Sequence, residues 1–147
     1  MSIVARIEDA QLLWHSGRHE GAFLSALIAV AATSRLRFPD RKAMNDGDAF
    51  EAFLKSTHDV RLSVEFRGEL HSIERIFYKW LRCELVHEAK LPVDIEFFRD
   101  GVCRTLSVRA GGAPEFKLRL SEGWFQHLVG LVVSAQENTS AFSEHDV

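Results

Sequence analysis

The sequence predicts a mainly α-helical protein, an antiparallel helical bundle with a small β-hairpin or sheet inserted before the last helix. Apolar residues recur at helical spacing, strand-like alternation is confined to short segments, and prolines fall at the ends of periodic stretches. The 147 residues, 46% hydrophobic and 27% charged, suit one globular domain. We assign residues 1–137 to that domain, about 93–120 to the β insert, and 138–147 to a polar tail expected to fray.

The N-terminal part predicts three helices. Residues 3–15 carry apolar side chains at helical spacing. The next helix, from residue 18 to about 37, is apolar on nearly every side, which is typical of a helix in the middle of a bundle, and Pro39 ends it. Asp48 with Glu51 three positions later resembles a capping box for the third helix.

Alternating apolar residues over 60–66 then predict a strand, and strong helical periodicity predicts a long helix over 69–89. The β insert follows. Segments 93–98 and 102–108 flank an Asp-Gly turn and predict a hairpin, and alternation over 116–120 predicts a third strand. A last helix begins after Ser121, its expected cap.

Charge and cysteine content narrow the function classes. The net charge of -3 excludes a bulk electrostatic binder of DNA or membranes, so any nucleic-acid site must be a local basic patch. Cys83 and Cys103 are too few for a disulfide scaffold and suit a reducing cytosol as free thiols. No signal peptide, membrane span or phosphate-binding loop is visible. We therefore expect a cytoplasmic protein with no membrane association, metal or cofactor.

One stretch, residues 77–88, crowds reactive groups into the second half of the long predicted helix. Arg82 and His87 are five residues apart, about 140° around a straight helix, so they meet only in a groove between helices. Its other polar candidates are supporting residues: Tyr78, Lys79, Glu84 and Glu88. A second basic group at a helix end could contact phosphates or simply be a solvated helix terminus: Arg35, Arg37, Arg41 and Lys42.

Arg82-x4-His87, late in a helix of a small helical chain, resembles the R-x4-6-H motif of HEPN domains. The resemblance implies an often dimeric helical domain, with metal-independent RNase activity in many members. It departs from the family at Cys83, where a polar residue usually follows the arginine, and in the β insert. The departure at Cys83 counts against full RNase activity, and the β insert is not part of the family's minimal helical domain.

The chemistry that the resemblance implies is cleavage of RNA by its own 2′-hydroxyl, as in a toxin or defence RNase with a cognate antitoxin. His87 would transfer the proton and Arg82 would bind the phosphoryl oxygens. A homodimer would bring two copies of the pair toward one cleft. The alternatives are a non-catalytic module that binds a nucleotide, RNA or a protein, and a structural dimer in which the motif joins two helices.

Overall fold

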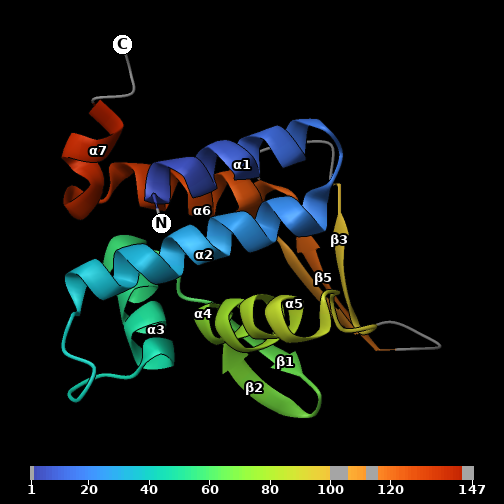
Figure 1. Ribbon diagram of the computed structural model, residues 1–147. Coiled ribbons are helices and arrows are strands. Elements are labelled where there is room, and N and C mark those ends of the chain that lie inside the picture. Colours follow the sequence, from blue (N-terminus) through green and yellow to red (C-terminus); the bar gives the residue numbers. More distant parts are fainter. Residues whose placement is uncertain (1, 100–105, 112–115, 144–147) are drawn as a thin grey trace.

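The computed structural model describes residues 2–99, 106–111 and 116–143, and helices make up most of them (Figure 1). Two small β-sheets complete the described chain, and the larger one precedes the last long helix. The prediction of a mainly helical protein with a β insert is therefore confirmed at this level. Within the described ranges, no helix has both the length and the apolar character that crossing a membrane requires.

Two N-terminal helices lie side by side and have the predicted bounds within one residue. In α1 (Ile3–His15), the Ser2 hydroxyl caps the first turn by accepting the Ala5 amide at 3.2 Å. The second helix, α2 (His19–Arg37), is buried on several sides because α1, α3 and α6 all pack against it. This explains why its sequence is apolar nearly all round.

The third helix, α3 (Asp46–Thr57), begins earlier than predicted. The Asn45 side chain accepts the Asp48 amide at 2.8 Å, so Asn45 is the N-cap. The prediction of Asp48 as the capping residue was wrong, because Asp48 already lies in the first turn.

A hairpin follows α3. Its strands, β1 (Ser63–Phe66) and β2 (Glu69–Ser72), are antiparallel, and Arg67 and Gly68 form the turn with φ of 52° and 80°. Two left-handed residues are what a type I′ turn requires. The strand predicted over 60–66 is thus confirmed in part, but the segment 69–72 was wrongly assigned to a helix.

The long helix consists of α4 (Ile73–Arg75), η1 (Ile76–Arg82) and α5 (Cys83–Glu88) without interruption. The middle part, η1, is a π-helix, in which the Cys83 amide donates to the Tyr78 carbonyl five residues before it. The sequence analysis did not predict this widened turn. The helix ends at Ala89, which has a left-handed φ of 60°.

The second sheet has the strand order β3 (Ile95–Phe98), β5 (Lys117–Ser121), β4 (Val108–Gly111). Because β5 lies between β3 and β4, the predicted hairpin of 93–98 with 102–108 was wrong. β3 pairs with β5 in parallel and β4 pairs with β5 antiparallel, a register that places Ile95, Leu118 and Leu120 in the core. Cys103 and parts of the predicted turns at 99–101 and 111–114 lie outside the described residues.

The C-terminal part forms α6 (Gly123–Ser134), the short 3-10 turn η2 (Gln136–Asn138) and α7 (Thr139–Ser143). Ser121, the expected cap of α6, instead accepts the Ser107 amide through its hydroxyl at 2.9 Å. Residues 139–143, which fall in the predicted polar tail, form the short helix α7, and the fraying of the tail stays a prediction. The Asn138 side chain is buried and donates to Thr33 Oγ1 at 3.0 Å and to the Val132 carbonyl at 2.9 Å.

Candidate functional site

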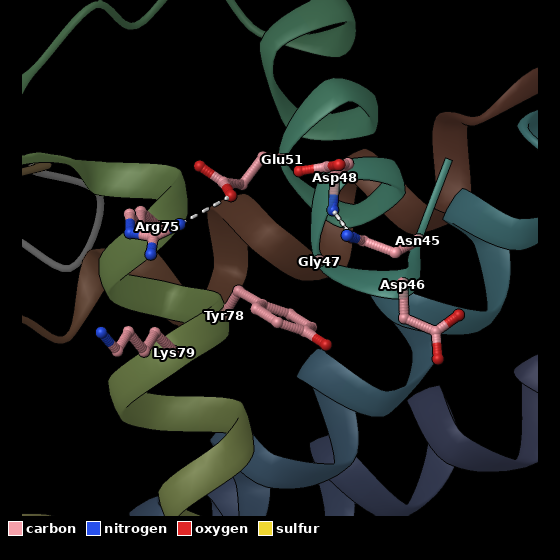
Figure 2. A pocket seen from close by; sticks show the side chains of 8 residues that line it. All are labelled: Asn45, Asp46, Gly47, Asp48, Glu51, Arg75, Tyr78 and Lys79. Carbon is pink, nitrogen blue, oxygen red and sulfur yellow. Dashed lines mark hydrogen bonds and ion pairs between the residues drawn. The ribbon is translucent and has the colours of Figure 1, made fainter. Parts of the chain in front are cut away.

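A cavity of about 460 Å³ lies between the first turn of α3 and the outer face of the α4–η1 helix (Figure 2). This volume is within the usual range for a small-molecule site. The residues that line it come from two elements: Asn45, Asp46, Gly47, Asp48 and Glu51 on one wall, and Arg75, Tyr78 and Lys79 on the other. We call it the α3–η1 pocket. Among these residues, the sequence analysis had proposed only Tyr78 and Lys79 as site residues, and had assigned Asp48 and Glu51 to a helix cap.

The α3 wall is positioned by the helix cap. Asn45 satisfies the Asp48 amide, and its carbonyl accepts the Ala49 amide at 2.9 Å. The amides of Asp46 and Gly47, at the start of the helix, have no partner within it. Gly47 is essential to the shape, because a Cβ there would lie 2.8 Å from Tyr78 Cε1.

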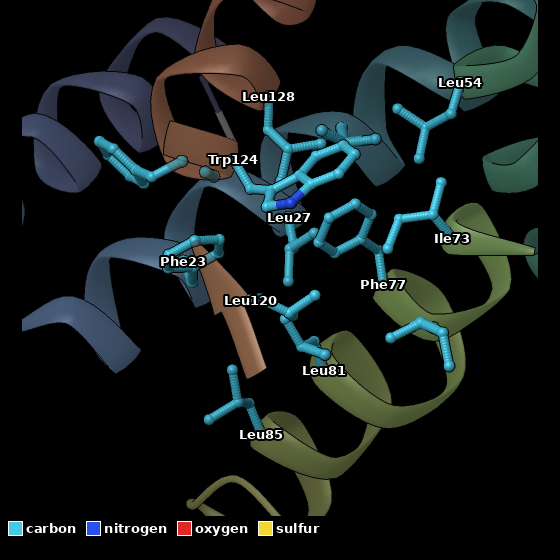
Figure 3. Packing of buried hydrophobic residues seen from close by; sticks show 14 of the residues in the cluster. Phe23, Leu27, Leu54, Ile73, Phe77, Leu81, Leu85, Leu120, Trp124 and Leu128 are labelled. Carbon is cyan, nitrogen blue, oxygen red and sulfur yellow. The ribbon is translucent and has the colours of Figure 1, made fainter. Parts of the chain in front are cut away.

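The second wall is held in place by the buried side of the same helix. Figure 3 shows Ile73, Phe77, Leu81 and Leu85, spaced four residues apart, all directed into the core. In a straight α-helix this spacing drifts by about 40° at each step. The wider π-helical turn reduces that drift and leaves the polar residues of η1 facing outward. Such π-helical turns are frequent at functional sites.

Tyr78 extends from the η1 wall of the pocket toward the α3 wall. Its ring reaches from η1 toward the first turn of α3 (Figure 2) and packs against Phe50 at 5.2 Å between ring centroids. Burial, together with the nearby Cys83 thiol, raises the pKa of the Tyr78 hydroxyl. The hydroxyl therefore stays protonated at neutral pH and is a hydrogen-bond donor.

Asp46 lies beside three guanidinium groups. Arg35 donates to Asp46 Oδ1 at 2.7 Å and Arg41 donates to the same oxygen at 3.0 Å. The Arg35 hydrogen bond, followed by the charges of Arg35, Arg41 and Arg82, holds the pKa of the Asp46 carboxyl below its ordinary value. One carboxylate thus faces three cations.

Arg82 is the least satisfied of these cations. Its guanidinium carbon lies 5.7 Å from the centroid of the Tyr78 ring, and its buried Nε has no hydrogen-bond partner in the part of the chain that the structure describes. Lys79, one turn earlier, has its ammonium 4.8 Å from the Trp80 ring. Neither forms an ion pair with a described residue. By contrast, Arg75 lies 3.6 Å from Glu51.

The proposed catalytic pair is not joined within the chain. His87 is exposed in the last turn of α5 and makes no hydrogen bond, ion pair or ring contact with the described residues, whereas Arg82 is half-buried near Tyr78. The charge of Glu84 helps to raise the pKa of the Arg67 guanidinium, and Glu88 is exposed. The structure therefore brings together Arg82, Tyr78 and Lys79 near the pocket, but not the other three candidates.

The predicted RNA-binding group divides in two. The Arg35 guanidinium donates to Asp46 and to the carbonyls of Phe38 and Met44. Arg37 donates to both carboxylate oxygens of Glu137, each at 2.8 Å, and to the Ser56 hydroxyl. These two arginines connect segments of the chain, a structural role that the sequence analysis did not anticipate. Arg41 and Lys42 are exposed.

A second polar cluster lies in the core, away from the α3–η1 pocket. Glu74, only 2% exposed, accepts from His58 Nε2 at 2.9 Å, and His58 Nδ1 lies 2.9 Å from His127 Nε2. We call these residues the Glu–His–His cluster. In the described residues, no group of three or more His, Cys, Asp or Glu has an arrangement that could hold a metal ion.

Some of the missed pocket residues had a visible signal. Asn45 followed by two aspartates is typical of a helix start, and Arg75, Tyr78 and Lys79 share one helical face by their spacing. The proximity of these two segments had no such signal, since it depends on how α3 packs against the later helix.

Comparison with known families corrects the sequence-based resemblance. The family model that matches is described as Rv1289, and the match covers residues 2–147. The identification with HEPN domains was wrong, because a short Arg–His spacing is too weak a pattern to establish a family. No curated protein matches the chain significantly. No solved structure matches it significantly either.

Proposed function

The chain belongs to the Rv1289 family, and we propose that it is a binding protein that takes a nucleotide, or the phosphorylated end of an RNA chain, in the α3–η1 pocket. The observation that carries this proposal is a pair of cations at the pocket, Lys79 and Arg82. Lys79 lines the pocket, Arg82 lies beside the ring of Tyr78, another lining residue, and neither cation forms an ion pair with the described residues.

Two cations without ion-pair partners at one end of the pocket favour an anionic ligand. A phosphate group accepts hydrogen bonds from a guanidinium in a bidentate geometry and from an ammonium as a point charge. The Tyr78 hydroxyl, kept protonated by its raised pKa, adds a donor nearby. The positive side of the pocket therefore suits a phosphate.

The opposite wall favours a ligand that also has hydrogen-bond donors. Asp48 is exposed, lines the pocket and forms no ion pair with any described residue. Its carboxylate oxygens can accept from ribose hydroxyls or from an amino group of a base. A nucleotide has a phosphate at one end and such donors at the other, and so complements both walls better than inorganic phosphate does.

The geometry supports binding rather than cleavage. Metal-free cleavage of RNA needs a proton acceptor within hydrogen-bond reach of the 2′-hydroxyl and a cation at the phosphoryl group. Within one chain, no described contact links His87 to Arg82.

We keep as proposals the antiparallel arrangement of the helices as a bundle, the homodimer, a cognate antitoxin and the cytoplasmic location.

The test is calorimetric titration of the protein with inorganic phosphate, AMP, ATP and a 5′-phosphorylated RNA oligonucleotide, each with EDTA. Lys79→Ala should weaken binding of every phosphate ligand by about tenfold, the loss of one charge-assisted hydrogen bond. Asp48→Ala should weaken binding of AMP and leave inorganic phosphate unaffected. Lys90→Ala, which removes an exposed lysine after the end of the helix, is the matched control.

Two results would contradict the proposal. One is that none of the four ligands produces a heat of binding. The other is equal binding by the Lys79→Ala and Lys90→Ala proteins. In parallel, labelled RNA is incubated in EDTA with the unmodified protein and, separately, with the His87→Ala variant, which tests cleavage. Cutting that is lost in this variant would show that the protein is a nuclease.

A further inference from the structure

The outer face of the three-stranded sheet carries a row of charges that the sequence analysis did not identify. Glu96 of β3 is the partner of Arg119 in the central strand β5, and Arg119 is in turn the partner of Arg109 in the edge strand β4. Lys117 and Phe98 lie on the same side, two residues along their strands from Arg119 and Glu96.

Alternation along the strands explains why these residues face outward. Ile95, Leu118 and Leu120 are buried, and the Phe97 ring stacks on Phe23 of α2 at 4.1 Å between centroids. The inner face of the sheet is thus occupied by the core. Side chains one position away along each strand point to the opposite face.

The charges on this face do not balance. Glu96 accepts hydrogen bonds from both Arg119 and Lys117, so two cations share one carboxylate. Arg109 is exposed, and among the described residues it pairs with no carboxylate. Its guanidinium carbon lies 4.3 Å from the centroid of the Phe98 ring.

Arg109 opposite Arg119 is also unfavourable for the sheet itself. Like charges directly opposite each other on adjacent strands are destabilising. Glu96 moderates the repulsion from one side only, because it lies across Arg119 from Arg109. A sheet face with such a pair is suited to an anion that bridges the two guanidinium groups.

We propose that this face binds a single-stranded nucleic acid, with Arg109 and Arg119 contacting the phosphodiester backbone and a base stacking over the guanidinium–ring pair of Arg109 and Phe98. Aromatic rings beside cations are what sequence-tolerant binders of single strands use. The carboxylates of an acidic peptide could pair with the arginines, but they offer no flat base to stack on the Phe98 ring.

This surface is distinct from the α3–η1 pocket. The pocket lies between α3 and η1, whereas the sheet lies beyond the end of α5 (Figure 1). The inference therefore does not depend on the proposed nucleotide site. Either can fail alone, since Lys79→Ala changes the pocket and Arg109→Ala changes the sheet.

The experiment measures fluorescence anisotropy of labelled oligonucleotides of roughly 12 nucleotides, one of uridine and one of thymidine, over a series of salt concentrations. Arg109→Ala should weaken binding by about two- to fivefold and lower the slope of log affinity against log salt by about 0.7. Glu96→Gln should strengthen binding, because it removes the only carboxylate in the Glu96–Arg119–Arg109 row. Lys90→Ala, on a different element, should bind as the unmodified protein does.

The outcomes separate the possible ligands. Similar affinity for the two oligonucleotides supports recognition of the phosphodiester backbone. Tighter binding of the RNA supports the same recognition and indicates an additional contact to the 2′-hydroxyl. The proposal is overturned if neither oligonucleotide binds, if Arg109→Ala behaves as Lys90→Ala does, or if oligoglutamate displaces the strand as effectively as unlabelled oligonucleotide. Arg109 is exposed, and the loss of its contact with the Phe98 ring offsets the relief of repulsion from Arg119, so Arg109→Ala should change the melting temperature little. Unfolding then does not explain a loss of binding.

Discussion

Gly47 lies directly against the ring of Tyr78, so close that a methyl group in place of its hydrogen would overlap Cε1. This contact joins the first turn of α3 to η1 and fixes the width of the pocket between them. The two residues are far apart in the sequence, so the contact is not visible there. It forms because Phe50 and the buried residues of η1 pack α3 against the later helix.

Gly47→Ala should therefore displace Tyr78. The gain in helix propensity, about 1 kcal/mol, partly offsets an overpacking cost of about 1–3 kcal/mol, so a net loss of roughly 1 kcal/mol is expected. Chemical denaturation measures the loss, and near-ultraviolet circular dichroism, to which the single tyrosine and the three tryptophans contribute, reports any repacking of the aromatic side chains. An unchanged spectrum with unchanged stability would show that the contact is not tight. Gly130→Ala, where no atom lies within 4 Å of the added Cβ, is the control.

Truncation of two arginines near Asp46 should have different effects on stability. Arg35→Ala removes hydrogen bonds to Asp46, Phe38 and Met44 and should cost about 2–3 kcal/mol of stability. Arg82→Ala removes a side chain whose Nε has no described partner, so it should change stability little and weaken nucleotide binding. Denaturation and calorimetry on both variants test this contrast. A large loss of stability in Arg82→Ala would assign that residue a structural role.

Acid should weaken the fold through the Glu–His–His cluster. Burial, and then the neighbouring His58, lower the pKa of His127 below its ordinary value of 6.5. The unfolded chain therefore takes up this proton first, and the free energy of unfolding falls as the pH drops below about 6.5. Lys55 and Arg61 also lie near the cluster, Lys55 acting on Glu74 by charge and Arg61 donating to the His58 carbonyl. Denaturation between pH 5 and pH 8 measures the slope. It should flatten in His127→Gln but not in His87→Gln, which changes an exposed histidine.

Glu74 contributes at lower pH. Burial alone raises the pKa of its carboxyl, but the His58 hydrogen bond, a backbone hydrogen bond and nearby positive charge outweigh burial, and the pKa lies below its ordinary value of 4.5. Its stabilising effect is present above that pH and is lost as the pH falls through the lowered pKa. Glu74→Ala leaves His58 without its acceptor and should cost about 3–5 kcal/mol at neutral pH. A loss below 1 kcal/mol would contradict a buried, paired carboxylate.

The C-terminal turn should be part of the cooperative fold. Asn138 is buried and its amide links α2 to the end of α6 through Thr33 and Val132. Asn138→Ala should cost about 1–3 kcal/mol, the penalty for buried polar groups left without partners. Ser140→Ala, at an exposed position in α7, provides the comparison. Equal melting temperatures for the two variants would indicate that η2 frays independently.

Local patterns in the sequence were sufficient for some elements. The first two helices follow from their apolar spacing, and β1 follows from the alternation that ends at Phe66. Two local features were missed for physical reasons. Asn45 competes with Asp48 for the same cap, and the Arg67–Gly68 turn requires a positive φ that arginine rarely adopts.

Long-range pairing could not be predicted from these patterns. The parallel pairing of β3 with β5 connects residues more than 20 positions apart, and alternation alone does not specify which strand is the neighbour. The same limit applies to the candidate site. Tyr78 and Lys79 were identified from their own helix, but Asp48 joins them only through tertiary packing.

The most direct test of the central claim is a map of backbone amide chemical shifts during titration with ATP in the presence of EDTA. If the α3–η1 pocket binds the nucleotide, the amides of Asp46 and Gly47 and those of residues 78–82 should shift together and saturate with one affinity. Shifts confined to other parts of the chain, or none at saturating ATP, would contradict the account.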